Sequence, residues 1–271
     1  MKFRPKLRED QIAPILSEQH VKPGDTIVVW FSRGAASAVA LKETIRQYGD
    51  ICNIRAVSNP VVEEHSDNYR FSDDVSAWCN IEIETARNSK YPHCSAKEIW
   101  AERRFMAGVA GAPCTTQLKR EARFEWELKN KFEWIVLGFT VEETKTRYWP
   151  FLFFERRNTL PILQNANITK ADCYRIINDA GIDLPEIYRL GYPNANCIGC
   201  VKASSPTYWN HVRKIHPEVF IDRATQSREI GAKLVRYKGK RIFLDDLPAD
   251  AQGRTMKNMD VECGIFCPTF K

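Results

Sequence analysis

The 271-residue sequence lacks the features that mark exported and membrane-spanning chains. No apolar run approaches the roughly 18 residues that a membrane-spanning helix requires. Residues 1–24 mix Lys, Arg, Asp and Pro without the apolar core of a secretory signal, so we expect them to form a surface arm. These two absences predict a cytoplasmic protein that makes no membrane contact.

Concentrated charge is also missing, although the net charge at pH 7 is +6. The 40 Lys and Arg residues form no basic run, and a mildly basic balance suits anionic ligands in general. A nucleic-acid partner is therefore left open but is not required.

The nine cysteines do not indicate a disulfide framework. Their number is odd and the chain shows no export signal, whereas disulfide frameworks belong mainly to exported proteins. The cysteines therefore favour thiol chemistry or metal binding.

The segment SRGAAS, residues 32–37, carries neither of two common nucleotide-binding fingerprints, G-x-x-x-x-G-K-S/T and G-x-G-x-x-G. Gly34 and the alanines after it would let backbone N–H groups approach an anion at a helix N-terminus, where Ser32 or Ser37 can add a hydroxyl donor. A tight turn whose small residues only permit close packing explains the same residues. Both interpretations stay open on this segment alone.

Alternating strand and helix patterns predict an α/β fold: a mostly parallel, twisted sheet with helices on both faces. We expect a nucleotide-binding domain over residues 25–190 and a Cys-rich C-terminal extension over residues 191–271, packed on the same domain. The predicted strands cover residues 26–31, 51–57, 81–84 and 134–139. The predicted helices cover residues 95–106, 116–130, 169–181 and a pair within 206–232, followed by a hairpin over 236–244.

Five segments occur in an order that resembles the phosphoadenosine-phosphosulfate (PAPS) reductase family of the adenine-nucleotide alpha-hydrolase, or PP-loop, superfamily. They are the loop after the first strand, CTTQLKR (114–120), GFTVEETKTR (138–147), the stretch from 161 to 200 that ends in CIGC, and ECGIFC (262–267). The resemblance covers roughly residues 25 to 267. It implies an oxidoreductase that binds PAPS, the related adenosine phosphosulfate (APS) or ATP.

The resemblance also implies where the nucleotide binds. Ala36 stands where ATP-cleaving relatives carry an aspartate that would help to hold magnesium pyrophosphate, which disfavours ATP cleavage. Two family arginines are replaced by Thr140 and Val141. The residues expected to bind the nucleotide or its anionic end are Ser32, Arg33, Gly34, Ser37, Lys119, Gly138 and Arg147.

The tail implies a catalytic thiol by the same resemblance. Cys263 is expected to attack the sulfur of the bound sulfonucleotide, and Cys267 to resolve the intermediate as an internal disulfide. A thioredoxin-like protein would then reduce the enzyme. A frayed tail that only completes a metal site is the alternative.

The C-x-x-C pair Cys197 and Cys200 suggests zinc, iron–sulfur or redox chemistry. By the resemblance, Cys114, Cys197 and Cys200 are three ligands of a 4Fe-4S cluster, although Thr115 replaces the family's second adjacent cysteine. Candidates for the fourth ligand are Cys263, Cys267 and Cys94. The alternative is structural zinc, held by Cys197, Cys200, Cys263 and Cys267.

Two further functions stay open. One is sulfur transfer to, or base modification of, tRNA or DNA by a PP-loop protein. The other is a non-enzymatic, metal-stabilised module that binds a nucleotide or a partner protein. The sequence does not define the oligomeric state.

Overall fold

The computed structural model describes residues 7–108 and 111–256, and the chain divides into two compact units. Unit 1 comprises Met1–Ser58, Tyr69–Thr85 and Glu127–Leu184, and unit 2 comprises Asn59–Asn68, Ala86–Trp126 and Pro185–Lys271. This division differs from the sequence-based boundaries, because residues 86–126 belong with the C-terminal part of the chain.

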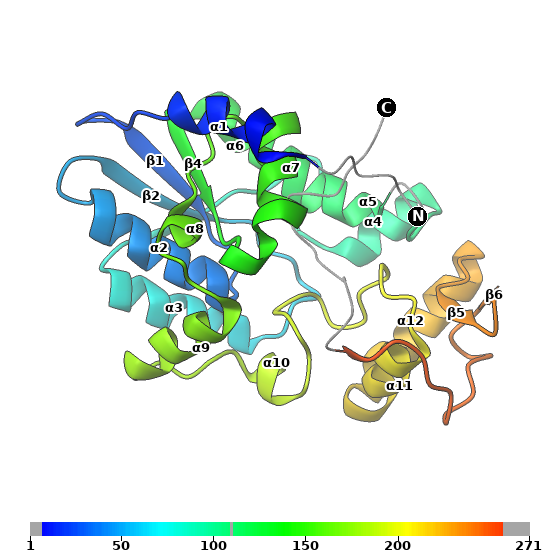
Figure 1. Ribbon diagram of the computed structural model, residues 1–271. Coiled ribbons are helices and arrows are strands. Elements are labelled where there is room, and N and C mark those ends of the chain that lie inside the picture. The colour runs from blue at the N-terminus through cyan, green and yellow to red at the C-terminus, as the bar shows by residue number, and fades with distance from the viewer. Residues whose placement is uncertain (1–6, 109–110, 257–271) are drawn as a thin grey trace. The chain divides into compact units, whose positions relative to one another are not determined.

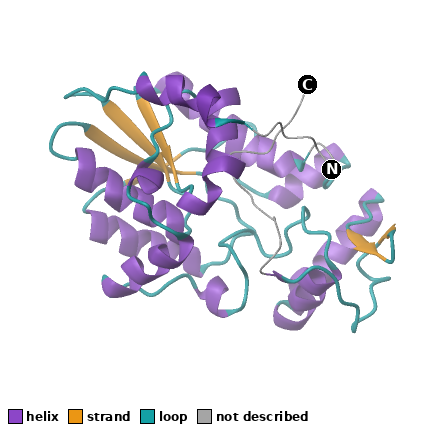
Figure 2. Ribbon diagram, viewed as in Figure 1, coloured by secondary structure: helices purple, strands orange, loops and turns teal. Residues whose placement is uncertain are grey.

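Unit 1 contains a four-stranded parallel sheet of order β3-β2-β1-β4, which confirms the predicted α/β fold class (Figure 2). The run TIVVW is apolar throughout because β1 is a central strand with four of its five residues buried. The strands are β1 (Thr26–Trp30), β2 (Asn53–Ser58), β3 (Ile83–Thr85) and β4 (Trp134–Leu137). All four lie where the sequence predicts strands.

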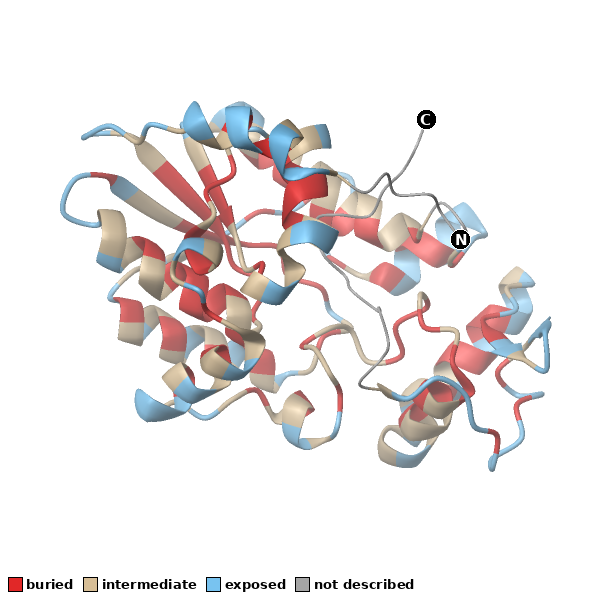
Figure 3. Cartoon of the chain, viewed as in Figure 1, coloured by how far each residue is buried: buried red, intermediate tan, exposed pale blue. Residues whose placement is uncertain are grey.

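Helices cover both faces of this sheet (Figure 1). Ile27, Val29 and Ala56 on one face share a core with α2, α3, α8 and α9, while α1 and α7 contact each other on the other side. The helices of unit 1 are α1 (Glu9–Ser17), α2 (Ala35–Tyr48), α3 (Asp67–Cys79), α7 (Trp149–Phe154), α8 (Ile162–Asn165) and α9 (Lys170–Asp179). Figure 3 shows the buried residues concentrated on the strands and on the helix faces turned toward them.

The predicted arm contains a helix. Residues 1–24 include α1, whose Ile12 and Ile15 are both buried. The expected capping of α9 by Thr169 is confirmed, since the Thr169 side chain accepts a hydrogen bond from the backbone N–H of Asp172.

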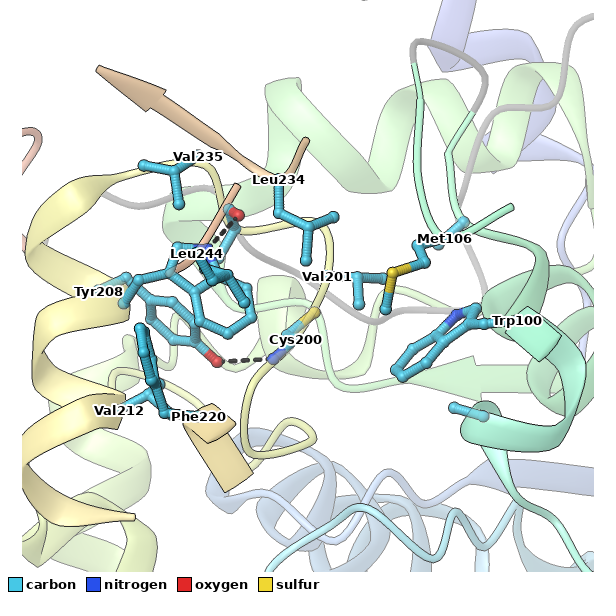
Figure 4. Close-up of a cluster of buried hydrophobic side chains, with 14 of the residues drawn as sticks. Trp100, Met106, Cys200, Val201, Tyr208, Val212, Phe220, Leu234, Val235 and Leu244 are labelled. Carbon is cyan, nitrogen blue, oxygen red and sulfur yellow. Dashed lines mark hydrogen bonds between the residues drawn. The ribbon is translucent and has the colours of Figure 1, made fainter. Parts of the chain in front are cut away.

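Unit 2 is built from helices around a second core (Figure 4). Cys200 and Val201 lie in this core with Tyr208, Trp209 and Phe220. The elements are α4 (Ala96–Arg103), α5 (Pro113–Thr115), the π-helix η1 (Thr116–Glu121), α6 (Ala122–Lys129, which crosses into unit 1), α10 (Glu186–Arg189), α11 (Pro206–Ile215), α12 (Pro217–Ile230), and the hairpin strands β5 (Val235–Tyr237) and β6 (Lys240–Ile242).

None of the helices in the described part of the chain is long and apolar enough to cross a membrane.

Two leucines in helices give a direct test of the first core. Leu41 on α2 is fully buried, whereas Leu128 on α6 is 88% exposed. We expect Leu41→Ala to lower the free energy of unfolding by about 2–5 kcal/mol and Leu128→Ala to change it by less than about 0.5 kcal/mol. Urea denaturation of both variants measures the difference, and equal effects would contradict the assigned core.

Candidate functional site

The first feature of the candidate site is the edge of the sheet where β1 and β4 end together. Trp30 pairs with Leu137 at the last position of both strands, so the two following loops begin side by side. The strand order also reverses here, because β2 lies on one side of β1 and β4 on the other. In open α/β sheets this switch point, beyond the carboxyl ends of the strands, is where ligands bind.

The loop after β1 is held in shape by two serines. Ser37 is buried, and its hydroxyl donates to the Gly34 carbonyl at 2.9 Å while accepting from the Ser32 N–H at 3.1 Å. The Ser32 hydroxyl lies 3.0 Å from that of Ser37. Gly34 is the N-cap of α2 and has no side chain that could cap the helix. The positive end of the helix dipole at this edge is therefore not covered by a side-chain oxygen of the cap residue.

Arg33 adopts a left-handed backbone conformation, with φ of 59°. Its side chain is 5% exposed, and the guanidinium carbon lies 4.4 Å from the centre of the Tyr69 ring. This conformation costs a non-glycine residue about 1–2 kcal/mol, and residues held in it are concentrated at functional sites. Sequence analysis placed Arg33 in the loop but could not identify Tyr69 as its neighbour.

Gly138, the residue after β4, packs directly on the first turn of α2. A Cβ atom at position 138 would lie 2.6 Å from the Ser37 nitrogen and 2.8 Å from its Cα. Only glycine fits, for reasons of space rather than backbone conformation. The predicted site residues Ser32, Gly34, Ser37 and Gly138 therefore do gather at the switch point.

The segment after Gly138 forms two tight helical turns, η2 (Val141–Glu143) and the π-helix η3 (Thr144–Tyr148). Glu143 accepts a hydrogen bond from the Thr140 N–H at 3.0 Å and forms an ion pair with Arg147. The Arg147 guanidinium also lies 4.8 Å from the centre of the Phe139 ring. Glu143 therefore holds the predicted anion-binding arginine.

Lys119 lies in unit 2 and is buried in an ion pair. Its amine donates to Glu64 Oε1 at 2.8 Å and to the Asn59 carbonyl at 2.7 Å. The sequence predicts Lys119 as an anion-binding cation but gives no sign of its pairing with Glu64, because 55 residues separate the two partners. Lys119 lies in η1, so both charged segments of the resemblance, 114–120 and 138–147, contain π-helical turns. Such turns are rare in proteins and frequent at functional sites.

The CIGC loop is anchored within the core of unit 2. The Cys200 N–H donates to the Tyr208 hydroxyl at 2.8 Å (Figure 4), and the Ile198 N–H donates to the Glu63 carbonyl at 2.9 Å. Gly199, with φ of 67°, makes the turn. Cys197 and Cys200 line one hollow together with Tyr192 and Tyr208.

A buried arginine lies beneath this loop. Arg223 is 2% exposed, stacks 4.4 Å from the centre of the Trp100 ring, and donates to Gln226 Oε1 at 3.0 Å. Its Nε is buried without a hydrogen-bond partner and would lie 3.6 Å from a Cβ at Gly199. Burial lowers the pKa of Arg223, and the carboxylates of Asp222 and Glu63 oppose this shift most. Asp222 Oδ2 lies 3.9 Å from the Arg223 Nη1, so the buried cation is already paired in part.

Two of the predicted metal ligands lie together among the described residues. Cys197 and Cys200 share a hollow, and Cys114 packs half-buried against the same core. Within the part of the chain that the structure describes, however, no three His, Cys, Asp or Glu side chains gather as a metal site. Cys94 donates to the Pro92 carbonyl, and Cys263 and Cys267 lie outside the described residues.

Three other cysteines lie in the core of unit 1, namely Cys52, Cys79 and Cys173. Burial raises the pKa of all three thiols, to about 11 for Cys79 and about 12 for Cys173. These residues act as small apolar side chains rather than as reactive thiols.

Comparison with known proteins gives similarity in structure only. No family model and no curated protein matches the sequence. Of the solved structures, the phosphate complex of PAPS reductase from Candida auris is 10% identical, with a TM-score of 0.45 over 71% of this chain and 89% of that one. The U34-tRNA thiolase NcsA from Methanococcus maripaludis, solved with its 4Fe-4S cluster, is 11% identical, with a TM-score of 0.43 over 82% of this chain and 78% of that one. At these identities and scores, the similarities assign no role to any residue of this chain.

Replacement of Gly138 should disturb the loop. We expect Gly138→Ala to lower the free energy of unfolding by about 1–3 kcal/mol, because its methyl group would overlap the Ser37 backbone. The variant should also weaken binding of adenine nucleotides, as measured by calorimetry. Gly181→Ala is the control, since position 181 has open space around it and a φ of 72°. We expect Gly181→Ala to strain the backbone at position 181 but to leave nucleotide binding unchanged. If the two variants bind nucleotide equally well, the role of Gly138 in the loop is contradicted.

The raised thiol pKa values predict which cysteines resist alkylation. At pH 8 a thiol of pKa about 11 is ionised in only about one molecule in a thousand. Cys79 and Cys173 should therefore stay unmodified by iodoacetamide in the folded protein and react in urea, as measured by peptide mass spectrometry. Because the raised pKa values favour the neutral thiol, the thiolate fraction should rise about tenfold with each pH unit and reach one half only near pH 11 for Cys79 and near pH 12 for Cys173. Rapid native labelling of either residue at pH 8 would show that the assigned burial is wrong.

Proposed function

We propose that this chain is a PAPS reductase-like enzyme of the PP-loop superfamily that binds an adenine sulfonucleotide at the switch point between β1 and β4. The observation that carries the proposal is the contact of Gly138 with the Ser37 backbone, which joins the end of β4 to the first turn of α2. Without side-chain bulk at Gly34 and Gly138, a phosphate or sulfate group can approach the backbone N–H groups of the loop.

PAPS or APS suits this loop better than ATP as a reacting substrate. The residues 32–37 contain no carboxylate that would help to hold magnesium pyrophosphate. A sulfonucleotide needs no such group, because its sulfur is already activated by the adjacent phosphate. ATP is the alternative ligand of the same loop.

The proposed reaction uses a thiol of the C-terminal tail. The Cys263 thiolate attacks the sulfonucleotide sulfur, forming an S–S bond and breaking the sulfur–oxygen bond to the nucleotide, which leaves as the phosphate anion. A second thiolate, from Cys267 or a thioredoxin-like dithiol, then attacks the Cys263 sulfur. A disulfide forms and sulfite leaves, so the two thiols supply the two electrons.

We further propose that the CIGC loop holds a thiolate-bound metal centre, with Cys114, Cys197 and Cys200 as ligands. Cys267 is the fourth ligand where Cys263 is the nucleophile, and Cys263 or Cys267 where the tail only completes the metal site. The shared hollow of Cys197 and Cys200, and the packing of Cys114 against the same core, support this proposal. A 4Fe-4S cluster is the first choice and zinc the alternative. When bound, either would link segments of the chain that are far apart in sequence.

The second candidate function is sulfur transfer to tRNA or DNA. It is favoured by a hollow of unit 2 in which four basic side chains lie around one carboxylate. Nucleic acids are polyanions, and such clusters supply much of their binding energy.

Sulfite release tests the proposed reaction. The anaerobically purified protein, given reduced thioredoxin and PAPS or APS, should release sulfite, and Cys263→Ser should reduce the rate at least about a thousandfold because the nucleophile is lost. Cys52→Ser, in the core of unit 1, is the control and should keep the rate.

Iron and zinc contents of the same preparations identify the metal centre. Nucleotide binding without sulfite release from either donor would leave the non-enzymatic module as the better function. Sulfite release that survives Cys263→Ser would overturn the assigned nucleophile.

A further inference from the structure

The C-terminal part of unit 2 contains a hollow of about 610 Å³ that is lined by basic side chains. Among the described residues around it are Lys202, Arg236, Lys238 and Arg254, whereas Asp250 is the one carboxylate. The formal charge of this lining is therefore +3, four cations less one anion. Neither the loop after β1 nor the CIGC loop contributes a residue.

The walls of this basic hollow are fixed by hydrogen bonds. The Arg236 N–H donates to the Ser204 carbonyl at 2.9 Å, which joins the β5–β6 hairpin to the segment before α11. The Ser205 hydroxyl donates to the Arg254 carbonyl at 2.7 Å, and the Gly253 N–H donates to the Thr207 hydroxyl at 2.9 Å. The backbones that carry the cations are thus held in place before a ligand arrives.

The lysine of the hairpin turn has no ion-pair partner among the residues that the structure describes. Lys238 and Gly239 have φ values of 45° and 79°, as in the tight turns that fit two-residue hairpins. The Lys238 amine lies 5.2 Å from the centre of the Tyr237 ring, which also lines the hollow. By contrast Arg228, on α12, is neutralised by Asp245 and Asp246.

The basic hollow combines the two elements that bind single-stranded nucleic acids. In such sites fixed cations contact the phosphate backbone and aromatic rings stack on bases. Here the part-buried ring of Tyr237 lines the hollow together with the cations. The charge also continues beyond the hollow to Lys240 on β6, which is exposed. A row of cations longer than one ligand pocket favours a polymer over a single small anion.

We propose that this hollow binds a single-stranded segment of nucleic acid through its phosphate backbone, with Tyr237 stacking on a base. The proposal uses none of the residues assigned to the sulfonucleotide site. It therefore stands or fails independently of sulfite release.

The test compares two variants with equal net charge. The first, Arg236→Gln/Lys238→Asn/Arg254→Gln, removes three cations of the hollow and keeps the turn, because asparagine tolerates a positive φ. The control, Arg46→Gln/Lys131→Gln/Arg175→Gln, removes three exposed cations of unit 1. Both lower the net charge from +6 to +3.

Binding of a fluorescein-labelled 20-nucleotide single-stranded DNA and of unmodified tRNA is measured by anisotropy from 50 to 200 mM salt. We expect the hollow variant to bind at least about tenfold more weakly than wild type, and its log K against log salt slope to be shallower by about 2, which is 0.7 for each of three lost contacts. The control variant should bind like wild type.

Three outcomes would overturn the proposal. They are unchanged binding by the hollow variant, equal loss in the control variant, and displacement of the oligonucleotide by inorganic phosphate or ATP at concentrations equal to its nucleotide content. The last would assign the hollow to a small phosphate ligand. Circular dichroism of both variants checks that the fold is intact. A further variant, Tyr237→Leu, keeps all charges and should weaken binding of the oligonucleotide without changing the salt slope.

Discussion

The contact between Gly138 and the backbone of Ser37 is the constraint on which the proposed nucleotide site depends. It exists because β1 and β4 pair in register to their last residues, so the loops that follow them begin at the same height. With any larger side chain at position 138, the end of β4 and the start of α2 would have to separate. The serines of the loop, held by each other's hydroxyls, could not then keep their positions. The shape of the loop is therefore set by sheet geometry first and by its own hydrogen bonds second.

A different constraint, burial of charge, governs the CIGC loop. Arg223 is buried against the ring of Trp100 and donates a hydrogen bond to the Gln226 side chain. Its Nε has no hydrogen-bond partner among the described residues. Such a group is stabilised by negative charge nearby. Asp222 supplies part of that charge, with its Oδ2 3.9 Å from the Arg223 Nη1, and the metal-bound thiolates proposed for Cys197 and Cys200 would add to it. Each unit therefore contains one of the two proposed sites, the turn after β1 in unit 1 and the CIGC loop in unit 2.

Sequence patterns predicted the elements of this fold better than the partners of its charged residues. Runs such as TIVVW predict buried strands, and Thr169 followed by Asp172 predicts a helix start, because both signals lie within a few neighbouring residues. The ion pair of Lys119 with Glu64 joins residues 55 positions apart, and no local periodicity reports it. The same holds for Arg33 against Tyr69. Of the candidate site, the glycines and serines at the strand ends follow from the sequence, and the catalytic roles of Cys263 and Cys267 stay predictions.

The division into two units has a consequence for how the protein is made. The chain passes from one unit to the other five times, at residues 58, 68, 85, 126 and 184. β1 cannot acquire its neighbour β4 until more than a hundred further residues have left the ribosome, because Thr26 and Trp134 belong to adjacent strands. Until β4 is made, the edge of β1 that pairs with it stays unpaired. Unpaired strand edges of this kind promote aggregation, and chaperones protect them during synthesis. Neither unit is one uninterrupted stretch of the chain, so a fragment that contains one unit alone would need its three segments joined directly to one another.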